Sequence, residues 1–195
     1  MGIPGTSATQ LTKVDLPEKI IKISAGSEIS LFLSETNTLY ACGTILSSQL
    51  NLDGEEPVKS PKKIAENIIE LSAGAKVFHV INTKNELLSL GTNVVGEAGT
   101  GDDIGMVKKL TKVNIPEKVK AVYSGNFFYC IAVTQSNQFY VWGENFNGEF
   151  ESSKNNIREP KLLEVNLVPQ RVVVGGGECL YSHLTTGCMP SARIW

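Results

Sequence analysis

Histidine, closely spaced cysteines and an excess of positive charge are all missing or scarce in this chain of 195 residues. With only two histidines, His79 and His183, there is little material for a histidine-lined metal centre. Cys179, His183 and Cys188 are the best candidates for zinc ligands, but a fourth ligand is missing and their spacing matches no standard site. No nucleophile, base or carboxylate pair forms a recognisable pattern either. We therefore expect no metal site, no cofactor and no catalytic residue.

The four cysteines show no close pairing, and no N-x-S/T glycosylation acceptor occurs. No segment resembles a signal peptide, and no apolar run approaches a membrane span. These absences favour a reduced intracellular protein, cytoplasmic or nuclear, with no membrane association. Cys42 and Cys130 lie in apolar runs, where we expect them to be small buried side chains.

The charge balance offers no general attraction to nucleic acid. Lysine and arginine number 18 against 20 aspartates and glutamates, a formal net charge of −2. Two small lysine clusters, Lys59 with Lys62 and Lys63 and Lys108 with Lys109 and Lys112, are typical of solvated loops. We predict no direct nucleic-acid binding.

What the chain does contain is a repeat. Leu11–Ile20 reads LTKVDLPEKI and Leu110–Val119 reads LTKVNIPEKV, and each copy leads into a short apolar run that ends at a glycine. Two further runs of this kind end at glycines, so that four repeat glycines follow one another at intervals of 48, 51 and 52 residues: Gly26, Gly74, Gly125 and Gly177. The chain is therefore a tandem array with a period of about fifty residues.

A second shared element follows each of the first three glycines and closes at another glycine, at Gly43, Gly91 and Gly143. Past its middle stands an asparagine: Asn37, Asn85 or Asn137. Asparagine tolerates the left-handed backbone of a tight hairpin, so each is predicted to form the turn between two strands.

Each unit reads as four short strands, because aromatic and β-branched residues dominate its apolar runs. In the third unit the strands are predicted near Val119–Tyr123, Tyr129–Val133, Gln138–Trp142 and Lys161–Val165. In the second unit they are predicted near Ile68–Ser72, Phe78–Asn82, Glu86–Leu90 and Leu110–Val113. Pro61–Leu71 could pass for a short helix, but its place in the repeat favours a connection followed by a strand.

Four strands in about fifty residues is typical of one blade of an all-β propeller of antiparallel strands. A β-solenoid competes, although its coils are shorter. We divide the single partial propeller domain, residues 1–195, into units at about 20–67, 68–118, 119–170 and 171–195, with 1–19 as the tail of a preceding blade. Three full units and parts of two others cannot close a seven-bladed ring, which needs roughly 350 residues. We therefore expect a piece of a longer propeller or, as an alternative, association of two copies through exposed terminal blades.

Two segments resemble the signature W-G-x-N-x-x-G-Q-L-G of the regulator of chromosome condensation repeats. Trp142–Phe150 reads WGENFNGEF, and Gly91–Asp102 reads GTNVVGEAGTGD, which includes the G-x-G-D tail. The resemblance extends over about residues 11–184, with two units matching well and two poorly. Glycines allow backbone angles and close approaches in such loops, the asparagines can bond nearby backbone, and Trp142 can fill the space between blades. The structural positions predicted on these grounds, besides the repeat and closing glycines, are Asn93, Gly96, Trp142, Asn145 and Gly148.

The resemblance implies a function in protein binding. The broader hypothesis is a non-enzymatic interaction platform, and the narrower one is a guanine nucleotide exchange factor, or part of one, for a Ran-like small GTPase. A carbohydrate-binding propeller is a third class, with no supporting pattern of residues. The glycine-rich stretch from Gly96 to Gly101 is a poor phosphate cradle, because Asp102 and Asp103 follow it and no Lys-Ser/Thr does.

Overall fold

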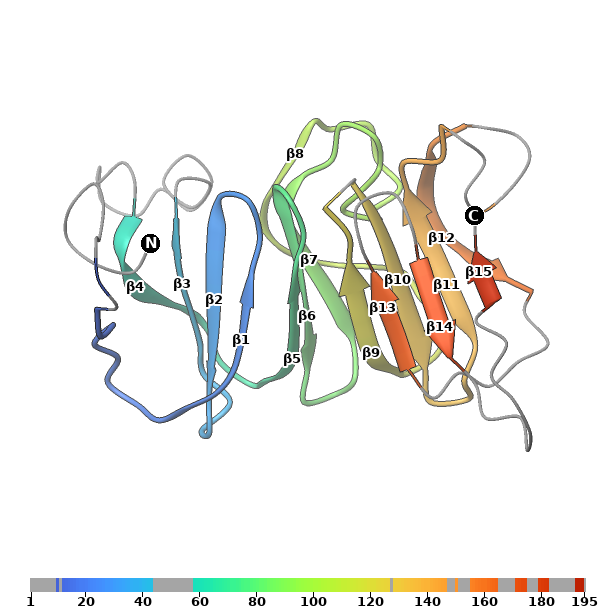
Figure 1. Ribbon diagram of the computed structural model, residues 1–195. Helices are drawn as coiled ribbons and strands as arrows, with labels where there is room; N and C mark the ends of the chain where they lie inside the picture. Colours follow the sequence, from blue (N-terminus) through green and yellow to red (C-terminus); the bar gives the residue numbers. More distant parts are fainter. Residues whose placement is uncertain are drawn as a thin grey trace.

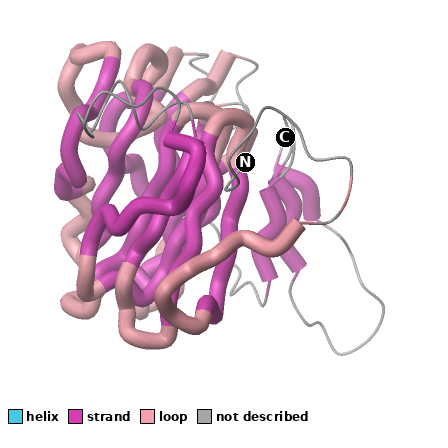
Figure 2. The backbone as a smooth tube through the Cα atoms, turned by 90° about the vertical axis from the view of Figure 1, so that its left-hand side faces the viewer, coloured by secondary structure: helices cyan, strands magenta, loops and turns pink. Residues whose placement is uncertain are grey.

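Antiparallel sheets account for the regular structure of this chain. The computed structural model describes residues 10, 12–43, 58–126, 128–146, 150, 155–164, 171–174, 179–182 and 192–194. Within these residues every regular element is a strand, and each sheet is built from strands consecutive in sequence (Figures 1 and 2). None of these segments forms a helix able to cross a membrane. The prediction of four-stranded antiparallel propeller blades is confirmed.

The first sheet contains β1 (Ile20–Ala25), β2 (Ile29–Ser34), β3 (Leu39–Gly43) and β4 (Val58–Ala65). The second contains β5 (Ile68–Ala73), β6 (Val77–Asn82), β7 (Leu87–Thr92) and β8 (Met106–Lys112). The third contains β9 (Val119–Ser124), β10 (Tyr129–Thr134), β11 (Phe139–Gly143) and β12 (Ile157–Leu163). A three-stranded sheet follows, with β13 (Arg171–Val174), β14 (Cys179–Ser182) and β15 (Ala192–Ile194).

The hairpins between the second and third strands turn where the sequence predicts. Asn37, Asn85 and Asn137 have φ angles of 63°, 61° and 65°. A short side chain that can bond locally makes this left-handed conformation less costly for asparagine than for most residues. The three turn predictions are confirmed.

The outermost strands differ from the predicted bounds. β8 begins four residues before the predicted Leu110, and β12 covers Ile157–Leu163 instead of Lys161–Val165. The segment expected as a connection before Ile68 contains the end of strand β4. An outermost strand is paired on one side only, so it tolerates proline and lysine and carries little apolar alternation. Both β4 and β12 contain a proline, which weakens the signal for a strand.

The first strands of successive sheets lie beside one another, and hydrogen bonds tie them together. β5 contacts both β1 and β9. The Ser24 hydroxyl accepts a bond from the Ala73 amide at 3.0 Å, and the Ser72 hydroxyl accepts one from the Ser124 amide at 2.9 Å. The serine two residues before each of the first two repeat glycines thus satisfies a backbone donor of the next sheet.

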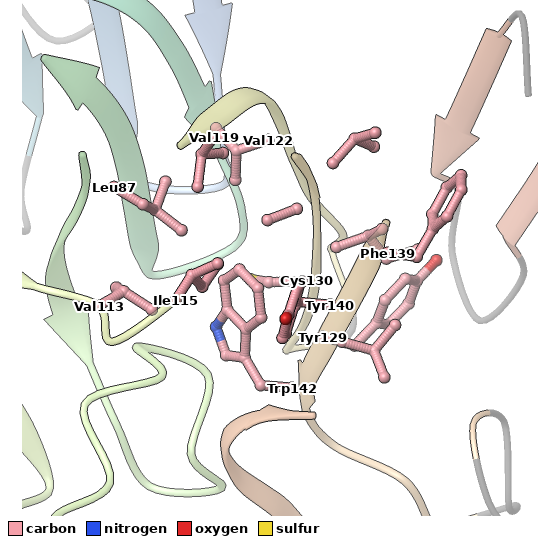
Figure 3. Packing of buried hydrophobic residues seen from close by; sticks show 14 of the residues in the cluster. Leu87, Val113, Ile115, Val119, Val122, Tyr129, Cys130, Phe139, Tyr140 and Trp142 are labelled. Atoms are coloured by element: carbon pink, nitrogen blue, oxygen red, sulfur yellow. The ribbon is translucent and has the colours of Figure 1, made fainter. Parts of the chain in front are cut away.

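The apolar core lies between the sheets. One buried cluster joins the first and second sheets and includes Leu31, Leu71 and Phe78. Another joins the second and third sheets, where Leu87 faces Val122 and Trp142 (Figure 3). The second sheet therefore buries one face against the first sheet and the other against the third, as stacked repeats require.

The repeated phrase has a structural role in the first and third sheets. In its second copy, Leu110–Lys112 ends β8 and the following residues lead into β9, as predicted. In the first copy residues 12–19 form no strand, and Leu11 lies outside the described residues. Glu18 accepts hydrogen bonds from Thr36 and, at 2.5 Å, from the Tyr40 hydroxyl, and these bonds lower its pKa to about 2.

The second copy repeats part of this arrangement, because Glu117 accepts a hydrogen bond from Ser136. In the second sheet Lys84 takes the equivalent hairpin position, and the equivalent glutamate, Glu66, pairs with Lys63 instead. The glutamate of each copy of the phrase thus holds the hairpin of the sheet that follows it, in the first and third sheets.

Candidate interaction surface at the signature loops

Two loops with the repeat signature follow the third strands of the second and third sheets and lie at the same end of the molecule. We call residues 93–105 and the described part of 144–156 the signature loops. The backbone amide of Asn93 donates to the Gly105 carbonyl at 3.0 Å, which closes the base of the first loop. The loop therefore projects beyond the sheet as a closed unit.

Asn93 holds the first loop from inside and is itself buried. Its side-chain oxygen accepts a hydrogen bond from the Ala98 amide at 3.1 Å. Its side-chain nitrogen donates to the Asp102 carbonyl at 3.1 Å and to the Asp102 carboxylate at 2.9 Å. Asn145 takes the same position in the next loop, where its oxygen accepts a bond from the Phe150 amide at 2.9 Å. The two asparagines give the two loops a common frame.

Glycines occur where a side chain would meet backbone. The closing glycines Gly43, Gly91 and Gly143 have φ angles of 137°, 134° and 102°, and a Cβ on each would lie 2.1–2.5 Å from a carbonyl oxygen of the facing turn. A Cβ on Gly26 would lie 1.8 Å from the Gly74 carbonyl oxygen, and one on Gly74 would lie 3.0 Å from that of Gly125. Neighbouring first strands therefore end in close backbone contact.

Gly96 also makes a close approach to a neighbouring sheet, since a Cβ there would lie 2.7 Å from the Arg158 Cα. Gly148 and Gly177 lie outside the described residues, as do His183 and Cys188, while Cys179 begins β14. Among the described residues no three histidine, cysteine or acidic side chains gather as metal ligands.

Trp142 links the signature loop of one sheet to the core of the next. Its indole nitrogen donates to the Glu97 carbonyl at 3.0 Å, and the side chain is fully buried. A Cβ on Gly99 would lie 2.7 Å from that nitrogen, so the loop presses its backbone against the indole. The first signature loop is thus packed on the third sheet, and its shape depends on both sheets.

We call the packed interface between two neighbouring sheets a seam. His79 lies in the seam between the second and third sheets, as a packed and hydrogen-bonded histidine. Its Nδ1 is 2.9 Å from the Ser124 hydroxyl. Its ring packs edge-on against Trp142, with 5.4 Å between the two ring centroids. Complete burial lowers the pKa of His79 to about 3, an effect opposed by a hydrogen bond with the Ala98 backbone. The side chain is therefore neutral at physiological pH. The prediction of a packed or hydrogen-bonded role for His79 is confirmed.

Cys42 and Cys130 are both buried in strands, which confirms the prediction for them. Burial raises the pKa of the Cys130 thiol far above its ordinary value. An inert thiol with 0% exposure has no access to a substrate. Cys130 and His79, although near each other, therefore form part of the core.

The outer surface of the signature loops exposes apolar side chains. Val94 is 64% exposed, Ile104 51% and Phe146 56%. Val94 and Phe146 each come directly after the buried asparagine of their loop, and Val94 and Ile104 flank the Asn93–Gly105 bond. Exposed apolar residues at repeated positions of fixed loops are typical of a contact surface. In the sequence, the apolar residue directly after each signature asparagine could have revealed this exposed surface.

Charged side chains surround these apolar positions. Arg158 donates to the Val94 carbonyl at 3.2 Å and pairs with Asp103 at 2.9 Å, which connects the third sheet to the first signature loop. Lys76 pairs with Glu28 at 3.2 Å across the first and second sheets. The surface therefore combines apolar side chains with a polar rim, as many protein interfaces do.

Comparison with known proteins supports the repeat assignment. The family model described as the regulator of chromosome condensation (RCC1) repeat matches residues 20–44. A search of curated proteins found no match to the chain. The sequence match thus identifies one repeat, within β1 to β3.

Solved structures show the same fold at low identity. Yeast RCC1 (Prp20) in its complex with Kap60 is 17% identical, with a TM-score of 0.75 over 87% of this chain and 42% of that one. Prp20p from Saccharomyces cerevisiae is 23% identical, with a TM-score of 0.67 over 80% and 42%. Human WBSCR16 is 16% identical, with a TM-score of 0.69 over 87% and 49%. The matched region is less than half the length of each of these proteins.

Proposed function

We propose that the chain is a protein-interaction platform, because residues 20–44 match the regulator of chromosome condensation repeat and its sheets fold as blades of a β-propeller. In this proposal it performs no covalent chemistry itself. Its working surface is the outer side of the signature loops, and its partner is a protein.

The observation that carries the proposal is the exposure of Val94, Ile104 and Phe146 on loops that are held from inside. Each loop is braced by a buried asparagine, and the first is also packed against Trp142. A loop that is already ordered loses little conformational entropy when it binds. Apolar side chains presented in this way can bury surface against a partner without rearrangement of the fold.

An affinity-capture experiment tests the platform. The immobilised chain is compared with the variant Val94→Ser/Ile104→Ser/Phe146→Ser in native cell extract, and captured proteins are quantified as the amount of extract increases. We expect at least one protein to bind saturably to the natural chain and to lose about tenfold in apparent affinity on the triple variant.

The matched control is Leu162→Ser, which removes an apolar side chain that is 45% exposed on β12, away from the signature loops. It should leave capture unchanged. The proposal fails if no protein binds saturably, or if the control and the triple variant lose binding equally.

We also propose where the chain acts and how its domain divides into repeat units. The chain acts inside the cell, in the cytoplasm or the nucleus, and it forms a single partial propeller whose units begin at Ile20, Ile68, Val119 and Arg171. These positions are the first residues of β1, β5, β9 and β13.

A second candidate function is guanine nucleotide exchange on a Ran-like small GTPase. The similarity to yeast Prp20p, whose structure is described together with its binding to Gsp1p and histones, favours this candidate. Exchange would work by differential binding, since a platform that prefers the nucleotide-free GTPase promotes nucleotide release. Release of a labelled guanine nucleotide from a panel of small GTPases is the measurement. Acceleration of one member supports exchange, whereas no acceleration of any member contradicts it and leaves the platform proposal standing.

A further inference from the structure

We infer that the uncovered face of the first sheet is a second docking surface, which takes the terminal sheet of another propeller chain. The sheet that fits this face has an innermost strand ending in Ser-x-Gly. The surface lies on β1 and β2, apart from the signature loops, and the inference goes beyond the proposed function.

The position three residues before each repeat glycine shows that this face is open. Leu71 and Val122 take this position on β5 and β9 and are 2% and 4% exposed, whereas Ile23 on β1 is 70% exposed. Phe32 pairs with Ile23 across β1 and β2 and is half-buried. Its equivalents in the second and third sheets are 0% exposed: Val80 and Ala132. We call Ile23, Phe32 and the neighbouring Ala25 the open face.

Two seams within the chain show what such a face packs against. The second strand of the preceding sheet lies over it, since β2 contacts β5 and β6 contacts β9. Leu31 on β2 shares a buried cluster with Leu71, and Ile81 on β6 shares one with Val122. The open face therefore has the apolar side of a seam without the strand that covers it, among the described residues.

The polar contacts of the two seams indicate the chemistry of the partner. The Ala73 amide donates to the Ser24 hydroxyl, and the Ser124 amide donates to the Ser72 hydroxyl, which in each case belongs to the preceding sheet. Ala25 takes the equivalent register on β1 and is exposed. Its amide therefore points away from β2, where a covering sheet can supply the hydroxyl that accepts its hydrogen bond.

The repeat glycine adds a requirement of shape. A Cβ on Gly26 would lie 1.8 Å from the Gly74 carbonyl oxygen, so the glycine of the earlier sheet lies directly on the carbonyl of the later one. On β1 the Gly26 carbonyl takes the place that the Gly74 carbonyl has on β5. Since a side chain would prevent so close an approach, the partner strand must end in glycine, with a hydroxyl side chain two residues before it.

A second copy of this chain does not offer such a strand end. Ser24 and Ser72 are already bonded within their own chain. The third sheet has Tyr123 at this position, and the sequence has Gly175 two residues before Gly177. The open face is therefore assigned to a sheet of another propeller chain, and self-association is an outcome that the test can reveal.

The repeated phrase makes it possible to place such a sheet on the open face. A copy of residues 68–109 is inserted between Gln10 and Leu11, so that the first copy of the phrase follows it. In the natural chain the same segment is followed by the second copy of the phrase. The inserted segment thus presents Ser-x-Gly in the place that precedes β1.

Two measurements report on the open face. The variant Ile23→Cys is treated with a maleimide, and its labelling rate is measured by mass spectrometry of the labelled peptide. We expect labelling to be at least about a hundredfold slower with the insertion than without it, because a buried thiol reacts only when the structure opens. Hydrogen exchange of the Ala25 amide should slow at least about tenfold.

Matched variants separate the apolar and polar contacts. Ile69→Cys on β5, where Ile69 is 40% exposed with both neighbouring sheets in place, should change its labelling rate less than about twofold on insertion. Ser72→Ala in the inserted copy alone should restore fast exchange at Ala25, because the acceptor is lost, while Ile23→Cys stays protected.

The inference is overturned if Ile23→Cys reacts equally fast with and without the insertion, or if Ser72→Ala leaves exchange at Ala25 unchanged. The natural chain decides even where the insertion fails to fold. There Ile23→Cys should react at least about tenfold faster than Leu71→Cys at every chain concentration. Equal rates, or labelling that slows as the chain concentration rises, contradict the inference, the latter by showing that a second copy covers the face.

Discussion

Replacing Leu71 with alanine is expected to lower the free energy of unfolding by about 3 kcal/mol. Leu71 lies on β5, is 2% exposed, and packs in the cluster that joins the first two sheets. Its removal leaves a cavity in a seam where both sheets already meet closely, so the lost contacts are not replaced. Equilibrium denaturation with urea, monitored by tryptophan fluorescence and circular dichroism, measures the change.

The control is Ile23→Ala, three residues before its repeat glycine just as Leu71 is. Ile23 lies on β1 and is 70% exposed, because no described sheet covers this face of the first sheet. We expect it to cost less than about 1 kcal/mol, mainly through strand propensity. Equal costs for the two substitutions would mean that the face of β1 is covered as fully as that of β5, and would contradict the arrangement of the seams.

Acidification should destabilise the chain well before its carboxylates are protonated. His79 has a folded pKa of about 3 against an ordinary value of 6.5. Below pH 6.5 the unfolded chain binds a proton that the folded chain does not bind, so the stability present above pH 6.5 is lost as the pH falls toward 3. Between pH 6.5 and 4.5 the loss from this side chain should be about 2 kcal/mol. Denaturation curves at several pH values measure it.

The double variant His79→Leu/Ser89→Ala is the matched control. His79 and Ser89 face each other across β6 and β7, and the first sheet has Leu31 and Ala41 at the equivalent positions. The variant therefore copies an apolar pair already used in this fold, and Ser124 keeps a contact with the Ser72 carbonyl at 3.4 Å. Its stability should be nearly constant from pH 6.5 to 4.5. A slope equal to that of the natural chain would show that His79 is not the group responsible.

Below pH 4.5 the loss of stability comes from carboxylates and not from His79. Hydrogen bonds from Thr36 and Tyr40 lower the pKa of Glu18 to about 2, and bonds from Lys112 and Asn82 lower that of Glu86. The stability these groups contribute is present above their ordinary value of 4.5 and is lost as the pH falls below it. The window from pH 6.5 to 4.5 thus separates the histidine from the carboxylates.

Several features of the fold were predictable because they depend on local chemistry. The period of the repeat glycines, the strands rich in β-branched residues and the turns at Asn37, Asn85 and Asn137 all follow from preferences of short segments. The outermost strands were less predictable. Their stability comes from pairing with a neighbour, and charged or proline-containing segments such as Ile157–Leu163 show little of this in their own sequence.

The amino-acid sequence by itself determined that this protein is an array of four-stranded β-units, since backbone preferences and a fifty-residue period are properties of the chain. The tertiary structure decided which residues at equivalent repeat positions differ in burial. Ile23 is exposed where Leu71 is buried, His79 occupies an apolar position of a seam, and Val94 and Phe146 project from braced loops. The physical reason is that burial, and with it pKa and availability for binding, depends on neighbouring sheets that lie about fifty residues away in sequence.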